Sequence, residues 1–125
     1  QFSAQRFCLA ATPISSSQLW LYNKTTQRIV YEQAKAACAD GFDVLLHNEH
    51  GELCEFTIGN LVLQLGDQFY TPPLAAGLLP GTLRAELLAR GVLHERTLYA
   101  ADLNLATGIW LINSVRGWLP MQLTH

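Results

Sequence analysis

The sequence has 125 residues, a formal net charge of -2, half hydrophobic composition and 14% charged residues. This length predicts one domain, residues 1–125, that can bury a core. The charge offers no basic surface for nucleic acid, and no apolar run reaches the roughly 20 residues of a membrane helix. We therefore expect neither nucleic acid nor membrane as a partner, and the scarcity of charge favours a surface covered by another protein or domain.

The three cysteines are Cys8, Cys38 and Cys54. Their wide spacing, with no C-x-x-C motif, predicts buried or half-buried thiols in a reducing compartment, and hence a cytoplasmic protein. His47 and His50 flank an expected turn but have no cysteines or acids at zinc-site spacing. No metal site is expected.

The N-terminal third alternates apolar runs with one amphipathic segment. Residues 6–12 and 19–23 are apolar runs of strand length, separated by Pro13 and three serines that indicate a loop. Between residues 29 and 40 the apolar positions recur at helical spacing and stop at Gly41, which predicts an amphipathic helix.

The middle of the chain has the pattern of successive hairpins. Runs over residues 43–48 and 52–57 are joined by a short loop containing glycine, and runs over 60–65 and 68–70 by a two-residue turn. Several strands joined by such short loops form an antiparallel sheet.

The C-terminal part begins with a loop bracketed by prolines and continues with a helix over residues 81–90. The remaining expected elements are a strand over 92–98, a helix over 100–107, and strands over 109–113 and 118–123. Locally paired strands with single helices between them predict an α+β fold with a mainly antiparallel sheet.

Lys24 is the first candidate for chemistry. The chain has only two lysines, and Lys35 lies one helical turn from Glu32, where it is most simply a solvated charge. Lys24 instead follows the aromatic-rich run L-W-L-Y-N. A lysine that forms a Schiff base needs partial desolvation to be neutral near pH 7, and this context favours Lys24.

Four motifs in order resemble the fold-type IV pyridoxal phosphate enzymes, also called class IV aminotransferases. They are K-T-T-Q-R from Lys24, E-F-T-I-G-N from Glu55, P-G-T-L-R from Pro80 and N-S-V-R-G from Asn113. The resemblance covers residues 19–123. It implies the large C-terminal domain of such an enzyme, with a barrel-like, mainly antiparallel sheet and a few helices.

The resemblance also implies roles for individual residues. Lys24 falls on the family's Schiff-base lysine, and Glu55 on the glutamate that keeps the ring nitrogen of pyridoxal 5'-phosphate protonated. Strand alternation alone does not decide between Glu55 and Glu52.

The cofactor phosphate would lie on the backbone of Thr82 and Leu83 at a helix start, with Ser114 as a second contact. Arg28 and Arg116 are candidates for substrate carboxylates. Either arginine could instead pair with an acid such as Glu32 or Glu95.

K-T-T-x-R and N-S-V-R-G are closest to the aminodeoxychorismate lyase branch, especially the lyase part of fused para-aminobenzoate synthases. The implied reaction converts 4-amino-4-deoxychorismate to para-aminobenzoate and pyruvate in folate biosynthesis. Two alternatives stay open: a fragment of a branched-chain or D-amino acid aminotransferase, and a non-catalytic assembly domain.

Family members also have a smaller N-terminal domain that closes the cofactor cleft. The chain begins at Gln1 rather than Met, so we expect a piece of a longer protein from which this domain is absent. Such a piece would bind the cofactor weakly or not at all and have little activity alone. The family resemblance also implies a homodimer.

Overall fold

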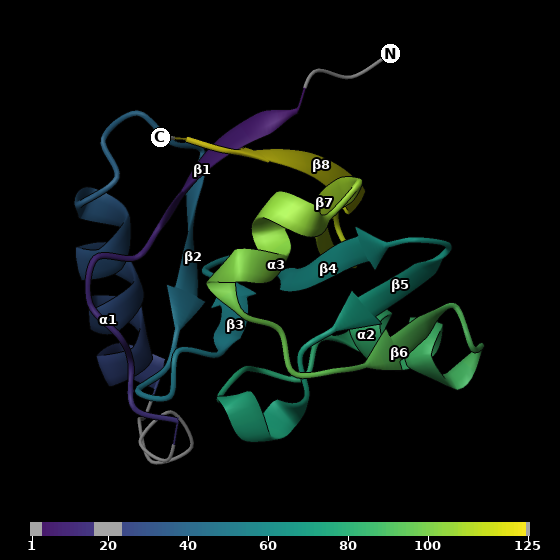
Figure 1. The fold of residues 1–125 in the computed structure, drawn as a ribbon. Coiled ribbons are helices and arrows are strands. Elements are labelled where there is room, and N and C mark those ends of the chain that lie inside the picture. Colours follow the sequence, from purple (N-terminus) through teal and green to yellow (C-terminus); the bar gives the residue numbers. More distant parts are fainter. Residues whose placement is uncertain (1–3, 17–23, 125) are drawn as a thin grey trace.

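The computed structural model describes residues 4–16 and 24–124, with residues 24–26 described by their backbone only (Figure 1). The strands are β1 (Gln5–Leu9), β2 (Asp43–His47), β3 (Leu53–Phe56), β4 (Asn60–Leu65), β5 (Gln68–Thr71), β6 (Leu93–Glu95), β7 (Gly108–Asn113) and β8 (Gly117–Leu123). The helices are α1 (Lys24–Ala36), α2 (Thr82–Ala89) and α3 (Ala100–Leu105), with a short 3-10 helix, η1, over Leu74–Ala76.

Most predicted elements are present, and the main boundary error lies in the first helix. The helix expected over residues 29–40 begins five residues earlier, at Lys24, and ends at Ala36. Its first turn, K-T-T-Q, has no apolar residue and two threonines of modest helix propensity, so periodicity could not reveal it. The run over 19–23 lies outside the described residues.

Six strands close into a barrel. The sheet order is β3-β2-β1-β8-β7-β4-β5-β6, and β4 also pairs with β3, which completes the ring. Most pairings are antiparallel, but β1 runs parallel to both β2 and β8, and β5 runs parallel to β6. The predicted α+β fold with a mainly antiparallel, barrel-like sheet is confirmed.

The interior of the barrel is filled by apolar side chains from its strands. They are Phe7, Leu45, Leu53, Phe56, Leu61, Leu63, Leu111 and Met121. The rings of Phe7 and Phe56 meet edge to face at 5.2 Å, and α3 adds Leu103 to the same cluster. Since the interior of a small barrel is packed in this way, a ligand must bind outside it.

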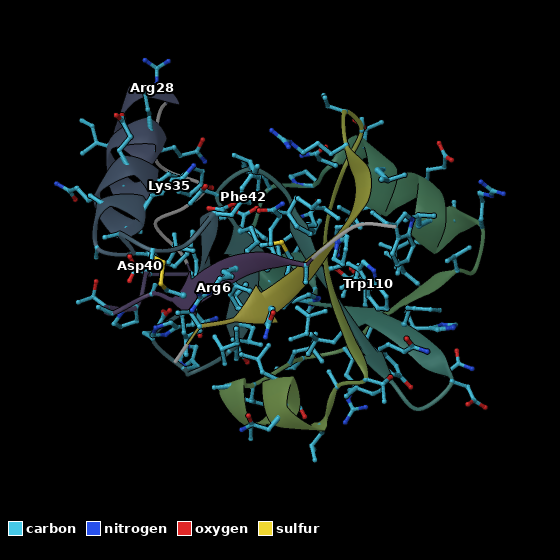
Figure 2. The ribbon with its side chains drawn as sticks, turned by 90° about the horizontal axis from the view of Figure 1, so that it is seen from above. Arg6, Arg28, Lys35, Asp40, Phe42 and Trp110 are labelled. Atoms are coloured by element: carbon cyan, nitrogen blue, oxygen red, sulfur yellow. A yellow bond between two sulfur atoms is a disulfide. The ribbon has the colours of Figure 1, made fainter. Side chains whose placement is uncertain are left out.

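Two helices cover opposite sides of the barrel, as both views show (Figures 1 and 2). Ala34 and Tyr31 of α1 pack in a cluster with Val44 and Leu46, the outward residues of β2. On the other side Leu87 of α2 packs with residues of β4, β6 and β7, in a cluster that Trp110 and Trp118 border. The two helices therefore fix two separate faces around the barrel.

An ion pair between the buried Arg84 and the exposed Glu95 anchors α2. The guanidinium of Arg84, only 3% exposed, lies 3.0 Å from the carbonyl of Pro72 and 2.5 Å from a carboxylate oxygen of Glu95 on β6. Burial of the charge is offset by these two contacts, both made by Nη2, although the buried Nε has no hydrogen-bond partner among the described residues. The pair holds the start of α2 against the loop that precedes it, and it engages Glu95, which we had considered as a partner of Arg28 or Arg116.

A bulge in β3 decides which way its side chains point. Leu45 pairs with Phe56 and His47 pairs with Leu53, so β3 has one more residue than β2 between these pairs. Leu53 and Phe56 both face the barrel interior, although they are three positions apart. The extra residue therefore puts both Cys54 and Glu55 outside the barrel.

The expectation of three thiols is wrong. Cys8 on β1 and Cys38 after α1, 30 positions apart in sequence, form a disulfide, and Cys54 is a buried free cysteine. The helix between the two cysteines returns the chain to β1, a proximity that sequence spacing could not show. The reducing compartment inferred from cysteine spacing thus loses its support.

Within the part of the chain that the structure describes, no helix is both long and apolar enough to cross a membrane.

The disulfide predicts one reactive thiol per chain after denaturation without reductant, because only Cys54 is free. A colorimetric thiol titration of the purified chain in guanidinium checks this, with three thiols expected after reduction as the control. Three thiols before reduction would show that Cys8 and Cys38 are not bonded.

Candidate active site

Glu55 is a carboxylate buried outside the barrel, only 3% exposed. The phenol of Tyr31 on α1 donates to its Oε2 at 2.7 Å, and the backbone amide of Leu79 donates to its Oε1 at 3.2 Å. Each carboxylate oxygen therefore has one fixed donor and retains capacity to accept another hydrogen bond.

Burial raises the pKa of Glu55 to about 7, because the charged form loses its hydration. The hydrogen bonds from Tyr31 and Leu79 favour the ion and lower the pKa, while the nearby carboxylate of Asp43 raises it. A carboxyl with this pKa can be made fully ionic at neutral pH by a cationic partner. Perturbed acids of this kind are typical of functional sites.

A cavity of about 290 Å³ opens beside Glu55. Four of the predicted site residues line it together: Glu55, Thr82, Leu83 and Ser114. They come from β3, the start of α2 and the turn after β7, so elements far apart in sequence meet at one place. The apolar side chains of Leu79 and Ile112 complete the walls.

The start of α2 offers amides to this cavity. Gly81 is its N-cap residue in extended conformation, and no side chain caps the helix. The first amides of such a helix have no intrahelical acceptor and attract anions. A Cβ at Gly81 would clash with Oδ1 of Asn60, whose Nδ2 donates to the carbonyl of Leu79 at 3.0 Å. Only glycine fits there without moving Asn60.

The turn that carries Ser114 is held by Asn113. Its Oδ1 accepts from the amides of Val115 and Arg116 at 3.1 and 2.7 Å, and its Nδ2 donates to the carbonyl of Ile58 at 2.8 Å. Ser114 is thereby kept on the cavity wall that also contains the start of α2. A hydroxyl and free amides on one wall suit an oxyanion such as phosphate.

A second cavity of about 370 Å³ adjoins the first, and both are lined by Thr57 and Ile58. Its walls also include Arg28, Tyr31 and Lys35. Arg28 is exposed near the start of α1 (Figure 2). Neither Arg28 nor Lys35 is in an ion pair with another described residue, so both cations are available to an anionic ligand.

The other predicted residues lie as follows. Lys24 is the first residue of α1, and its side chain is outside the described part of the structure. Arg116 lines neither cavity, because its guanidinium lies over the ring of Phe42, 5.3 Å from the centroid. Glu52, the alternative to Glu55, accepts a hydrogen bond from Asn48 at 2.8 Å.

Sequence reasoning missed three residues that shape the site: Tyr31, Asn60 and Asn113. Asn60 and Asn113 border glycine or turn segments, where an amide often satisfies loop backbone, and this was the available signal. Tyr31 gave no such signal, since its partner Glu55 is 24 residues away in sequence.

These residues fit pyridoxal 5'-phosphate. The dianionic phosphate matches the uncapped start of α2 and Ser114, and the protonated ring nitrogen matches the buried carboxyl of Glu55. The apolar walls suit the ring itself. The cavity also lies outside the packed barrel, where a ligand can enter.

Comparison with known proteins supports the same cofactor. The family model of class IV aminotransferases matches residues 2–123. A Schizosaccharomyces pombe protein provisionally assigned as an aminodeoxychorismate lyase is 40% identical over 102 residues, which are 75% of this chain and 44% of that protein. The chain spans about half the length of such relatives.

Solved structures agree in fold. A Mesorhizobium loti protein, provisionally assigned as an amino-acid aminotransferase, has a TM-score of 0.89 and 39% identity, with 98% of this chain and 60% of that one covered. The 4-amino-4-deoxychorismate lyase of Pseudomonas aeruginosa has a TM-score of 0.80 and 28% identity, with 96% and 47% covered. The family uses pyridoxal 5'-phosphate. The chain belongs to the class IV aminotransferase family.

Proposed function

We propose that this chain is the cofactor-binding part of a pyridoxal phosphate-dependent 4-amino-4-deoxychorismate lyase of folate biosynthesis. The observation that carries the proposal is the single cavity that unites Glu55 with the uncapped start of α2 and Ser114. The lyase branch is favoured by K-T-T-Q-R and N-S-V-R-G and by the similarity to lyases from Pseudomonas aeruginosa and Saccharomyces cerevisiae, the latter 32% identical over 80 residues.

Each residue has a defined task in this proposal. Amides of Thr82 and Leu83 and the hydroxyl of Ser114 hold the phosphate, and Glu55 accepts a hydrogen bond from the ring nitrogen. Lys24 holds the cofactor covalently through its amine. When bound, pyridoxal phosphate supplies an electron sink that stabilises negative charge on the substrate carbon.

Lys24 also acts as the base. Its free amine would take the proton from the ring carbon that bears the substrate nitrogen. The bond from the neighbouring ring carbon to the enolpyruvyl oxygen would then break, and the released enolpyruvate would take up a proton to become pyruvate. The six-membered ring would become aromatic. Covalent carrier and base are thus the same residue at different stages.

Arg28 is the first candidate for binding a substrate carboxylate, because it opens on the cavity that adjoins the cofactor site. Its planar guanidinium suits bidentate contact with a carboxylate. Arg116 remains the second candidate, and its use requires that the guanidinium leave the ring of Phe42.

We further propose that a smaller N-terminal domain, or a second copy of the chain in a homodimer, covers the mouth of this site. Ile58 and Leu79 line the cofactor cavity yet are 39% and 40% exposed. Apolar side chains at the rim of a cavity are typical of a surface that another protein part covers. A fused para-aminobenzoate synthase would supply such a domain within one polypeptide.

An aminotransferase is the second candidate function. It is favoured by the 39% identity to the Mesorhizobium loti protein and by a Thermotoga maritima relative, assigned as a branched-chain aminotransferase, that is 28% identical over 104 residues. An aminotransferase would convert the cofactor to its amine form with an amino acid donor, which a lyase does not require.

The two functions are separated by product analysis. We expect the longest natural polypeptide that contains this sequence to release pyruvate from 4-amino-4-deoxychorismate, and Lys24→Ala to abolish the release. Lys35→Arg is the control and should retain activity, because it keeps the positive charge beside the second cavity. Accumulation of the amine form of the cofactor with amino acids, without pyruvate release, would favour the aminotransferase.

The phosphate site predicts that Gly81→Ala weakens pyridoxal phosphate binding by roughly tenfold or more, since the methyl group must displace Asn60 and shift the first amides of α2. Equilibrium binding followed by tryptophan fluorescence measures the loss. Ala89→Gly at the far end of the same helix is the control for helix stability. Equal affinities of the wild type and Gly81→Ala would contradict this placement of the phosphate.

A further inference from the structure

Tyr31 is half-buried between the two adjoining cavities. It lines the cavity with Arg28, and its hydroxyl reaches Glu55, which lines the other. The hydrogen bond joins α1 to β3 across 24 residues of sequence at an O···O distance of 2.7 Å. It ties the helix that begins with Lys24 to the acid on the wall of the proposed cofactor site.

The surroundings make this hydroxyl a permanent donor. Burial, and then the negative charge of Glu55, raise the pKa of Tyr31, so the phenol keeps its proton throughout the physiological range. A phenol that cannot ionise can only present its proton to the carboxylate. The bond therefore favours the ionised form of Glu55 and fixes the orientation of its oxygens.

Other groups near Glu55 act in the opposite direction. Burial and the carboxylate of Asp43 on β2 raise the pKa of Glu55, and Cys54 beside it has its own pKa raised to about 12 and stays neutral. The Leu79 amide, from the loop before α2, is the second donor to the carboxylate. Among the side chains that the structure describes, only Tyr31 donates a hydrogen bond to Glu55 and so favours the charged carboxylate.

We propose that Tyr31 is a positioning residue that holds Glu55 ionised and turned toward the cofactor cavity, so that Glu55 can accept the ring N–H of pyridoxal phosphate. This inference rests on the proposed function, which places the ring nitrogen against Glu55. In this role Tyr31 acts on the ring nitrogen only through the carboxylate of Glu55.

The first test uses the chain without cofactor. The pKa of Glu55 is measured by ¹³C NMR of the carboxyl carbon in the wild type, Tyr31→Phe and the control Tyr70→Phe, whose ring lies on the sheet beneath Arg96. Tyr31→Phe should raise the pKa of Glu55 above its wild-type value, and Tyr70→Phe should leave it unchanged. An unchanged Glu55 pKa in Tyr31→Phe overturns the inference.

The second test compares pyridoxal 5'-phosphate with its 1-deaza analogue, in which a C–H replaces the ring nitrogen. Tyr31→Phe should lower the affinity for the natural cofactor by roughly ten- to hundredfold, which corresponds to the loss of a hydrogen bond to a charged group. The affinity for the analogue should stay unchanged. In a Glu55→Gln background the same substitution should have little further effect.

Equal weakening of both ligands would mean that the hydroxyl only supports the fold, which overturns the inference. If the longest natural polypeptide that contains this sequence bound neither ligand, the proposed function would fail, whereas the NMR measurement would still report whether Tyr31 controls the pKa of Glu55. The two failures are therefore distinguishable.

Discussion

The bulge in β3 is the constraint on which the site depends. Without the extra residue between Leu53 and Phe56, regular alternation from the inward-facing Leu53 would turn Glu55 into the barrel and Phe56 out of it. A glutamate inside the apolar barrel could not be satisfied, and a Phe outside it would leave the core unfilled. The bulge solves both problems at once, because it keeps Phe56 within the core and delivers Glu55 to the outer face.

The loop before α2 connects the two chemical ends of the cavity. The amide of Leu79 donates to Glu55, and its carbonyl accepts from Asn60, which packs against Gly81 at the helix start. Glu55 and Asn60 are themselves the pair at which β3 meets β4 and the barrel closes. The carboxyl and the anion-binding amides are thus positioned by one small set of backbone contacts, and Arg84 fixes the helix that follows.

Much of this arrangement was accessible from sequence. The hairpins around residues 43–70 follow from alternating apolar runs and short glycine-containing loops, and the start of α2 follows from Pro80-Gly81 before a periodic apolar segment. Glu55, Thr82, Leu83 and Ser114 were identified by their motifs, and the structure places them on one cavity. Local patterns report such features because they depend on neighbouring residues.

Features that depend on residues far apart in the sequence could not be predicted from the sequence. The disulfide of Cys8 with Cys38, the parallel pairing of β1 with β8, and the Tyr31 to Glu55 hydrogen bond all join segments that no local pattern relates. The choice between Glu52 and Glu55 depends on the bulge in β3, and the sequence of a four-residue strand does not reveal a bulge. Arg116 resembled a carboxylate-binding residue, yet its guanidinium lies over the ring of Phe42.

The central claim is that this chain binds pyridoxal 5'-phosphate through Lys24 in the cavity beside Glu55. Incubation with the cofactor, borohydride reduction and mass analysis of the resulting peptides test it most directly. The account predicts a reduced cofactor adduct on the peptide that contains Lys24, with far less adduct in Gly81→Ala. An adduct on Lys35, or none on the chain in its longest natural form, would contradict it.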